Sequence, residues 1–104
     1  MRRPGEAHQR IEREIRAEKA AALGQAGERL EAALSEAANL AGRVRVSSGA
    51  ERHALLGAYR AARARALQLR TYLLIQREAM GLRRHAVVDA QYPEPPVLAN
   101  ELET

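Results

Sequence analysis

The chain has 104 residues, a formal net charge of +4 and no cysteine. This length predicts one domain with a modest core, and the lack of cysteine excludes disulfides and thiolate metal sites. The N-terminus is charged rather than apolar, and no apolar run is long enough to cross a bilayer. We therefore expect a soluble cytoplasmic protein without membrane contact.

The first expected element is a long helix over residues 6–41. Its apolar or small residues recur with spacings of four and seven, an eleven-residue repeat close to the natural helix period. They are Ile11, Ile15, Ala22, Ala26, Ala33 and Ala37. Gly24 and Gly27 interrupt this helix, and each costs roughly 1 kcal/mol relative to alanine. Because the repeat passes through them without a phase shift, we interpret them as a close crossing with another element rather than a bend.

A loop is expected over residues 42–48, since Gly42 follows the last periodic residue and suits a left-handed helix end. Ser48 and Glu51 have the spacing of a capping box, which predicts that a second helix begins there and covers residues 49–80. Gly81 fits the glycine that ends such a helix.

The second helix carries a heptad seam, in which one residue of buried type recurs after four and then three positions. The seam residues are Leu55, Tyr59, Ala62, Ala66, Leu69, Leu73, Gln76 and Met80. Over residues 67–75 the helix is apolar on nearly every side, which is typical of a surrounded helix. The two helices form an antiparallel hairpin that cannot cover the seam alone. We therefore expect a homodimeric four-helix bundle, with docking on a larger protein assembly as a further expectation.

After Gly81 a short helix is expected over residues 84–90, ending before Tyr92 and Pro93 because a residue that precedes proline disfavours the helical conformation. Pro96 fits the first position of a last turn or helix over residues 96–102, with Leu98 and Leu102 facing inward. The predicted fold class is all-α: a long antiparallel hairpin with short C-terminal helices in a single domain over residues 1–104.

Arginines repeat at seven-residue intervals beside the seam, at Arg63, Arg70 and Arg77. One interpretation is that they contact an anion or a partner, together with Arg83 and Arg84. The other is structural: they pair with glutamates of a facing helix while their stems cover apolar surface. The glutamates considered are Glu14, Glu18, Glu28 and Glu31. We favour the structural interpretation, because the net charge is mild and no aromatic stacking motif for nucleic acid is present.

Gln76 is the one polar residue of the seam, and two interpretations stay open. It fixes the register and oligomeric state of the bundle, which we favour. Alternatively, it belongs to a polar pocket with Arg77, Glu78 and His85 that binds a small anionic ligand.

No catalytic or metal site can be assembled from the sequence. His8, His53 and His85 are far apart, and no glutamate has a histidine three residues later, as helical di-metal sites require. No nucleophilic triad or glycine-rich phosphate loop is present. We expect no enzyme activity and no cofactor.

The leading interpretation of the sequence is a non-enzymatic helical module for self-association and protein interaction. The alternative is a nucleic-acid-associated basic protein. A binder of a small anionic ligand is a remote alternative.

Several short segments resemble a family of small all-helical bacterial proteins of unknown function. They are Glu18–Ala20, Leu23–Gly24, Gly27, Arg29–Leu34, Gln76–Arg83 and Tyr92–Pro93. The resemblance implies a bacterial origin and an all-helical fold, and it implies no catalytic residue. It also implies that a site, if present, lies near Gln76, Arg77 and Glu78, with Gly81, Leu82 and His85.

Overall fold

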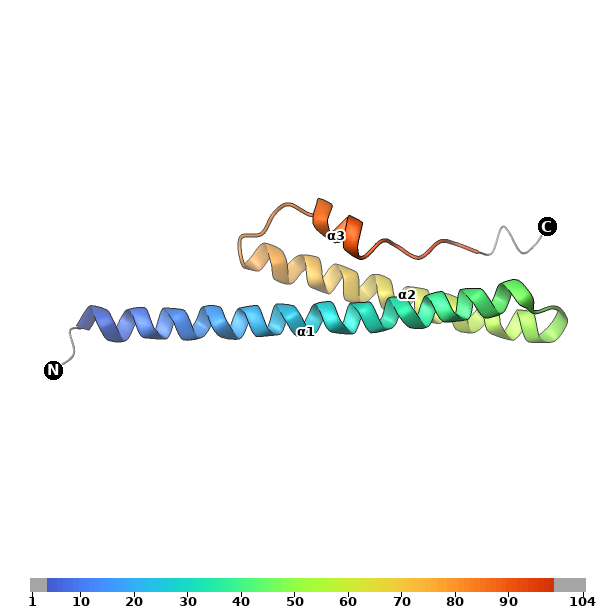
Figure 1. Cartoon of the computed structure of the whole chain (residues 1–104), viewed down its shortest axis with the longest axis horizontal. Helices are drawn as coiled ribbons and strands as arrows, with labels where there is room; N and C mark the ends of the chain where they lie inside the picture. The colour runs from blue at the N-terminus through green and yellow to red at the C-terminus, as the bar shows by residue number, and fades with distance from the viewer. Residues whose placement is uncertain (1–3, 99–104) are drawn as a thin grey trace.

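The computed structural model describes residues 4–98, which contain three helices and no β-strand: α1 (Pro4–Val46), α2 (Gly49–Ala79) and α3 (Ala86–Gln91). The two long helices pack against each other in an antiparallel hairpin, and the chain then turns back and runs along it (Figure 1). The molecule is elongated, 74 × 22 × 15 Å. The predicted all-α fold with two long packed helices is confirmed. The structure holds one chain, so the dimeric four-helix bundle stays a prediction.

Helix α1 is longer than the predicted helix at both ends, and the prediction of a loop over residues 42–46 is wrong. Gly42 lies inside α1, and the reason is packing, because Val44 is fully buried. Burying such a side chain is worth about 1.5–3 kcal/mol, more than the roughly 1 kcal/mol that a helical glycine costs. The helix ends where the Ser47 hydroxyl donates to the Val44 carbonyl at 2.9 Å. Only Ser47 and Ser48 connect the two long helices.

The two ends of α2 match the sequence signals to different degrees. Ser48 precedes the helix, as the capping-box spacing predicts, but its side chain makes no capping hydrogen bond. At the other end Gly81 has a φ of +82°, its amide donates to the Glu78 carbonyl at 2.9 Å, and the Leu82 amide donates to the Arg77 carbonyl at 2.9 Å. This pair of bonds is a Schellman motif, which reverses the chain.

We name residues 82–98 the C-terminal segment. Its helix α3 begins two residues later than predicted and ends one residue later. The predicted last turn from Pro96 is not helical as far as residue 98, and the rest of it, including Leu102, lies outside the described residues. Contacts with α2 hold this part of the chain instead, because the Pro96 carbonyl accepts from the Tyr59 hydroxyl and Leu98 packs in the cluster around Tyr59. Leu98 nevertheless faces inward and is 3% exposed.

The heptad seam of α2 is covered within the single chain. Its buried members are Leu55, Tyr59, Ala62, Ala66 and Leu73, and its half-buried members are Leu69, Gln76 and Met80. Apart from Ala66, the buried residues pack in clusters with α1 and with the C-terminal segment. The buried part of the seam is therefore an interface within the single chain.

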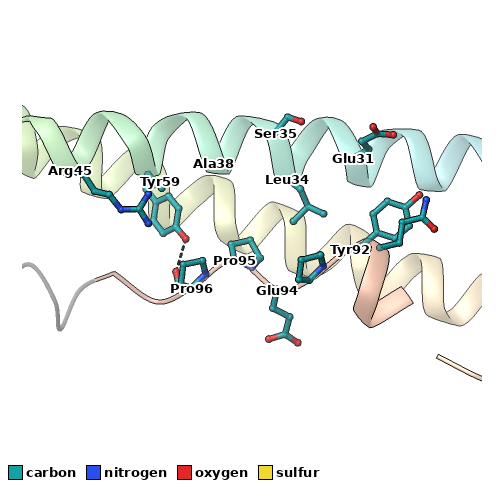
Figure 2. A pocket seen from close by; sticks show the side chains of 13 residues that line it. Glu31, Leu34, Ser35, Ala38, Arg45, Tyr59, Tyr92, Glu94, Pro95 and Pro96 are labelled. Carbon is teal, nitrogen blue, oxygen red and sulfur yellow. Dashed lines mark hydrogen bonds between the residues drawn. The ribbon is translucent and has the colours of Figure 1, made fainter. Parts of the chain in front are cut away.

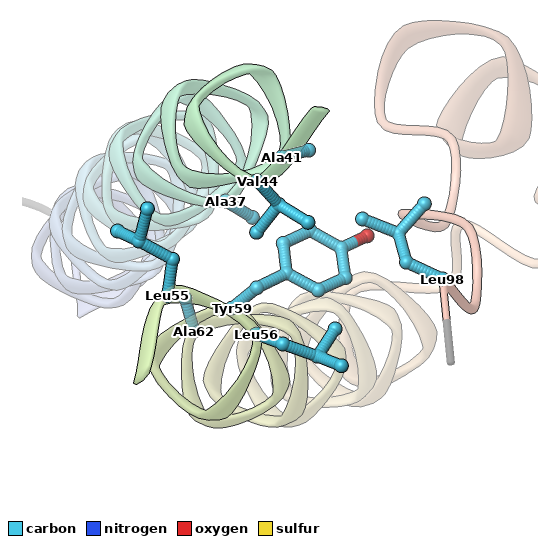
Figure 3. Packing of buried hydrophobic residues seen from close by; sticks show 8 residues of the cluster. All are labelled: Ala37, Ala41, Val44, Leu55, Leu56, Tyr59, Ala62 and Leu98. Carbon is cyan, nitrogen blue, oxygen red and sulfur yellow. The ribbon is translucent and has the colours of Figure 1, made fainter. Parts of the chain in front are cut away.

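Two clusters of buried side chains form the core. The cluster near the hairpin turn surrounds Tyr59, whose ring lies between Val44 of α1 and Leu98 of the C-terminal segment (Figure 3). The second cluster joins α1 and α2 to Val88 of α3. Between the clusters the buried residues are alanines, Ala33 and Ala66, which allow the two helices to approach closely.

The single chain alone does not surround residues 67–75, so their cover by a second copy stays a prediction. Tyr72 is 46% exposed and Ile75 is 58% exposed. The reason is that α1 and the C-terminal segment cover only part of the circumference of α2, and these two side chains lie on the uncovered part.

Helix α1 projects well beyond the end of α2 (Figure 1). We name residues 4–19 of α1 the overhang. Its side chains from residue 5 onward are exposed, apart from the half-buried Ala7. Ile11 and Ile15 continue the apolar repeat that is buried from Ala26 onward, yet they are 54% and 44% exposed. The overhang therefore carries an apolar stripe that nothing in the described chain covers.

Two valines near the end of α1 test the packing that extends this helix past Gly42. We expect Val44→Ala to lower the free energy of unfolding by about 2 kcal/mol, because it removes fully buried methyl groups and leaves a cavity. The matched control is Val46→Ala, two residues further along the same helix at a side chain that is 88% exposed, and its expected effect is within about 0.5 kcal/mol. Urea denaturation followed by circular dichroism measures both, and equal effects would contradict this account.

Candidate functional site

The C-terminal segment is held by the arginines that repeat along α2, which we name the arginine row: Arg63, Arg70 and Arg77. Each member donates a hydrogen bond to a main-chain carbonyl of this segment. The acceptors are the carbonyls of Pro95 for Arg63 at 2.9 Å, Tyr92 for Arg70 at 3.0 Å and Arg84 for Arg77 at 2.8 Å. The arginine row therefore has a structural role, but its partners are carbonyls and not the glutamates of α1 that the sequence suggested.

Arg70 makes the most contacts of the row. Its side chain is only 12% exposed, and besides the Tyr92 carbonyl it pairs with the carboxylates of Asp89 and Glu94. Both carboxylates are well exposed, so each ion pair adds little to stability. The hydrogen bond from a charged, largely buried donor contributes more, roughly 1.5–3 kcal/mol. Arg70 is therefore the central attachment point of the C-terminal segment.

Tyr59 holds the same segment at its far end. Its hydroxyl donates to the Pro96 carbonyl at 2.5 Å, and its ring packs against Leu98. The sequence analysis placed Tyr59 in the seam but did not predict this bond. The available signal was the run of Pro93, Pro95 and Pro96, which forces an extended backbone and leaves its carbonyls without helical partners.

A groove of about 490 Å³ lies between α1 and the C-terminal segment, and we name it the proline groove (Figure 2). Tyr59 lines it from α2. Its apolar lining on one side comes from Leu34, Ala38 and Ala41 of α1, and on the other from Tyr92, Pro93, Pro95 and Pro96. Arg45 and Glu31, which also line it, are fourteen positions apart on α1. No residue of this groove was predicted as a ligand site from the sequence.

A second hollow, of about 360 Å³, lies beside α3, nearer the N-terminus of α1 than the proline groove. Gly27 lines it, and a Cβ atom at this position would lie 3.1 Å from the Tyr92 hydroxyl. The sequence interpretation of a close crossing therefore applies at Gly27, where the crossing residue is Tyr92. It does not apply at Gly24, where a Cβ atom would meet nothing within 4 Å.

The residues of the predicted polar pocket are only partly brought together. Arg77 and Glu78 both contact the start of the C-terminal segment, and Glu78 Oε1 lies 2.9 Å from His85 Nε2. Gln76 instead turns to Tyr72, and its Nε2 donates to the Tyr72 hydroxyl at 2.8 Å. The Gln76 Oε1, Arg77 Nε and His85 Nδ1 atoms are buried without a hydrogen-bond partner among the described residues.

The remaining candidate residues lie at the surface. Arg83 and Arg84 are exposed in the turn that follows α2. The histidines do not gather: His8 pairs with Glu12 on the overhang, far from His85, and His53 is exposed on α2. Within residues 4–98 no three side chains of histidine, aspartate or glutamate are grouped so that they could hold a metal ion. In the same range no helix is both long and apolar enough to cross a membrane.

Comparison of the chain with protein-family models finds no matching family, and neither the curated proteins nor the solved structures contain a match. The resemblance to small bacterial helical proteins stays a prediction. Any function must therefore be argued from the surfaces of this molecule.

We expect Arg70→Met to free the middle of the C-terminal segment, because the methionine keeps the apolar stem but removes the donors to Tyr92 and Asp89. The free energy of unfolding should fall by about 2 kcal/mol, and the ¹⁵N relaxation of the Glu94 and Val97 amides should report faster motion. Arg65→Met is the matched control, since Arg65 is exposed on the same helix. Unchanged relaxation in the Arg70 variant would show that other contacts hold the segment.

The two glycines of α1 provide a second pair of variants. We expect Gly24→Ala to stabilise the protein by about 0.5–1 kcal/mol, because alanine favours the helix and the position is open. Gly27→Ala should gain less or destabilise, because the new methyl group pushes against the Tyr92 hydroxyl. Adding Tyr92→Phe to Gly27→Ala should recover part of the loss. Thermal unfolding measures all three, and an equal gain at both glycines would contradict the close approach of Tyr92.

Proposed function

We propose that the chain is a non-enzymatic helical module for self-association and protein interaction, and that the overhang is its docking surface. The proposal depends on one observation: the apolar stripe of α1 continues past the end of the core to Ile15 and Ile11, which are about half exposed. From Ala26 onward the same stripe is buried, at Ala26, Ala33 and Ala37. A helical face of this kind is normally covered by another helix.

We commit to a second copy of the chain as the occupant of this surface. The four glutamates of the overhang are balanced by three arginines and one lysine, so two overhangs do not repel each other through net charge. An antiparallel pairing about a twofold axis buries the stripes of both copies in one closed contact. Helices in proteins gain most of their stability from tertiary packing, and the overhang has none within the single chain.

A side-by-side four-helix bundle is the rival arrangement of the same dimer. It would use the uncovered part of α2, where Tyr72 and Ile75 are exposed. We favour the overhang because its isoleucines follow the same repeat as the buried residues Ala26, Ala33 and Ala37 of α1. In either arrangement the lack of cysteine supports a place in the reducing cytoplasm.

The nucleic-acid alternative has lost part of its support. It relied on the basic composition of the chain, with a pI of about 10.3, and on the row of arginines at seven-residue intervals, all three of which donate to carbonyls of the C-terminal segment. A guanidinium committed to an internal acceptor has fewer donors left for a phosphate. The proposed polar pocket for a small anion at Gln76 is also weakened, because Gln76 bonds to Tyr72.

We expect the double variant Ile11→Glu/Ile15→Glu to be monomeric at micromolar concentrations at which the unaltered chain sediments with twice its mass of 11.5 kDa. The charged side chains cannot be buried between two overhangs. Far-UV circular dichroism adds a second readout: the helicity of the unaltered chain should rise with concentration, and that of the variant should not. Both isoleucines lie outside the core, so the thermal unfolding of the hairpin should be preserved.

Ile75→Glu is the matched control, because it places the same charge on the other exposed apolar surface. It should leave the dimer intact. If Ile75→Glu alone dissociates the dimer, the side-by-side bundle is correct and the overhang pairing is wrong. If the unaltered chain is a folded monomer at micromolar concentrations, self-association is wrong altogether.

A further inference from the structure

The proline groove has the features of a ligand site that is independent of the overhang. Its volume of about 490 Å³ lies within the usual range for small-molecule sites, roughly 300–1,000 Å³. None of its lining residues belongs to the overhang.

The main chain of the groove walls offers few hydrogen bonds to a ligand. Pro93, Pro95 and Pro96 have no amide proton to donate. The carbonyls of Pro95 and Pro96 already accept from Arg63 and Tyr59. The backbone of α1 on the opposite wall is engaged in its own helix. A peptide strand would therefore find no ladder of partners here, whereas an alkyl chain needs none.

The charges of the groove are separated along its length. Arg45 lines it near Tyr59 and Pro96, and no carboxylate within residues 4–98 forms an ion pair with Arg45. Glu31 lies fourteen residues earlier on α1, which corresponds to about 21 Å along the helix axis. Between them α1 lines the groove with Leu34, Ser35 and Ala38 (Figure 2), and with Ala41. Along α1 the groove thus has a cation, a mainly apolar middle and an anion, in that order, and the second carboxylate of its lining, that of Glu94, pairs with Arg70.

We propose that the proline groove binds a single-chain anionic amphiphile, with its carboxylate at Arg45 and its alkyl chain along Ala41, Ala38 and Leu34. Glu31 at the far end disfavours a second negative charge, so a monocarboxylate binds better than a dicarboxylate of similar length. Burial of methylene groups supplies most of the affinity, and Arg45 sets the orientation.

Dodecanoate, used below the concentration at which it forms micelles, tests the site on the full chain. Tyr59 and Tyr92 line the groove and Tyr72 lies on the uncovered part of α2, and these are the only aromatic residues of the phenylalanine, tryptophan and tyrosine class in the chain. Their ring signals in NMR spectra therefore locate the ligand. We expect dodecanoate to shift the signals of Tyr59 and Tyr92 and to leave those of Tyr72 unchanged.

Calorimetric titration then tests the chemistry. Dodecanoate should bind at least about tenfold more tightly than octanoate, because four more methylene groups are buried, and more tightly than dodecanedioate. Arg45→Gln should weaken dodecanoate binding about tenfold, whereas Arg43→Gln, at an exposed arginine that does not line the groove, should not. Ala38→Trp should fill the groove and abolish binding. Its control is Ala32→Trp, at an exposed alanine of the same helix that does not line the groove.

The outcomes separate this proposal from its rivals. Shifts at Tyr72 instead of Tyr59 and Tyr92 would place the ligand elsewhere and overturn it. Equal binding of a nonionic dodecyl maltoside, with no effect of Arg45→Gln, would overturn the role of the charge. Absence of binding would overturn the site. Because the groove and the overhang share no residue, failure here leaves the dimer proposal standing, and the reverse also holds.

Discussion

Tyr59 is the side chain on which the rest of the structure depends. The chain has no phenylalanine or tryptophan, and its buried faces are mostly alanine, leucine and valine. A single large ring near the turn of the hairpin therefore fills a space that small side chains cannot. Its faces contact α1 and the C-terminal segment, and its hydroxyl satisfies the Pro96 carbonyl. One residue of α2 thus joins all three parts of the molecule, and it also lines the proline groove.

The helical periodicity was sufficient to predict the two long helices, because alternating spacings of apolar residues reflect directly which face is buried. The Schellman turn at Gly81 was equally readable, since only local backbone geometry decides it. The end of α1 was not readable at Gly42. There the burial of Val44 against α2 outweighs a local signal, and tertiary contacts of this kind are not encoded within a few neighbouring residues.

The site illustrates the same limit. Seven-residue spacing of Arg63, Arg70 and Arg77 correctly places them on one edge of α2, but a spacing does not name the acceptor. Two of the acceptors, the carbonyls of Pro95 and Tyr92, lie at the proline run, 32 and 22 residues from Arg63 and Arg70, and the third is the carbonyl of Arg84. The proline groove was missed for a related reason: its two walls come from distant parts of the chain, and neither wall carries a recognisable motif.

The hold of the arginine row on main-chain carbonyls has a consequence for how the sequence can vary. Because a carbonyl is present at every residue, the side chains of Glu94 and Val97 can be exchanged without removing the acceptors at Tyr92, Pro95 and Pro96. An insertion or deletion of one residue between Tyr92 and Pro95 is different in kind. It would change the distance between the Tyr92 and Pro95 carbonyls, so that they would no longer both lie opposite Arg70 and Arg63, which are seven residues apart on α2. At exposed positions such as Glu94 and Val97 the C-terminal segment is therefore tolerant of substitution, but it is intolerant of a change in length.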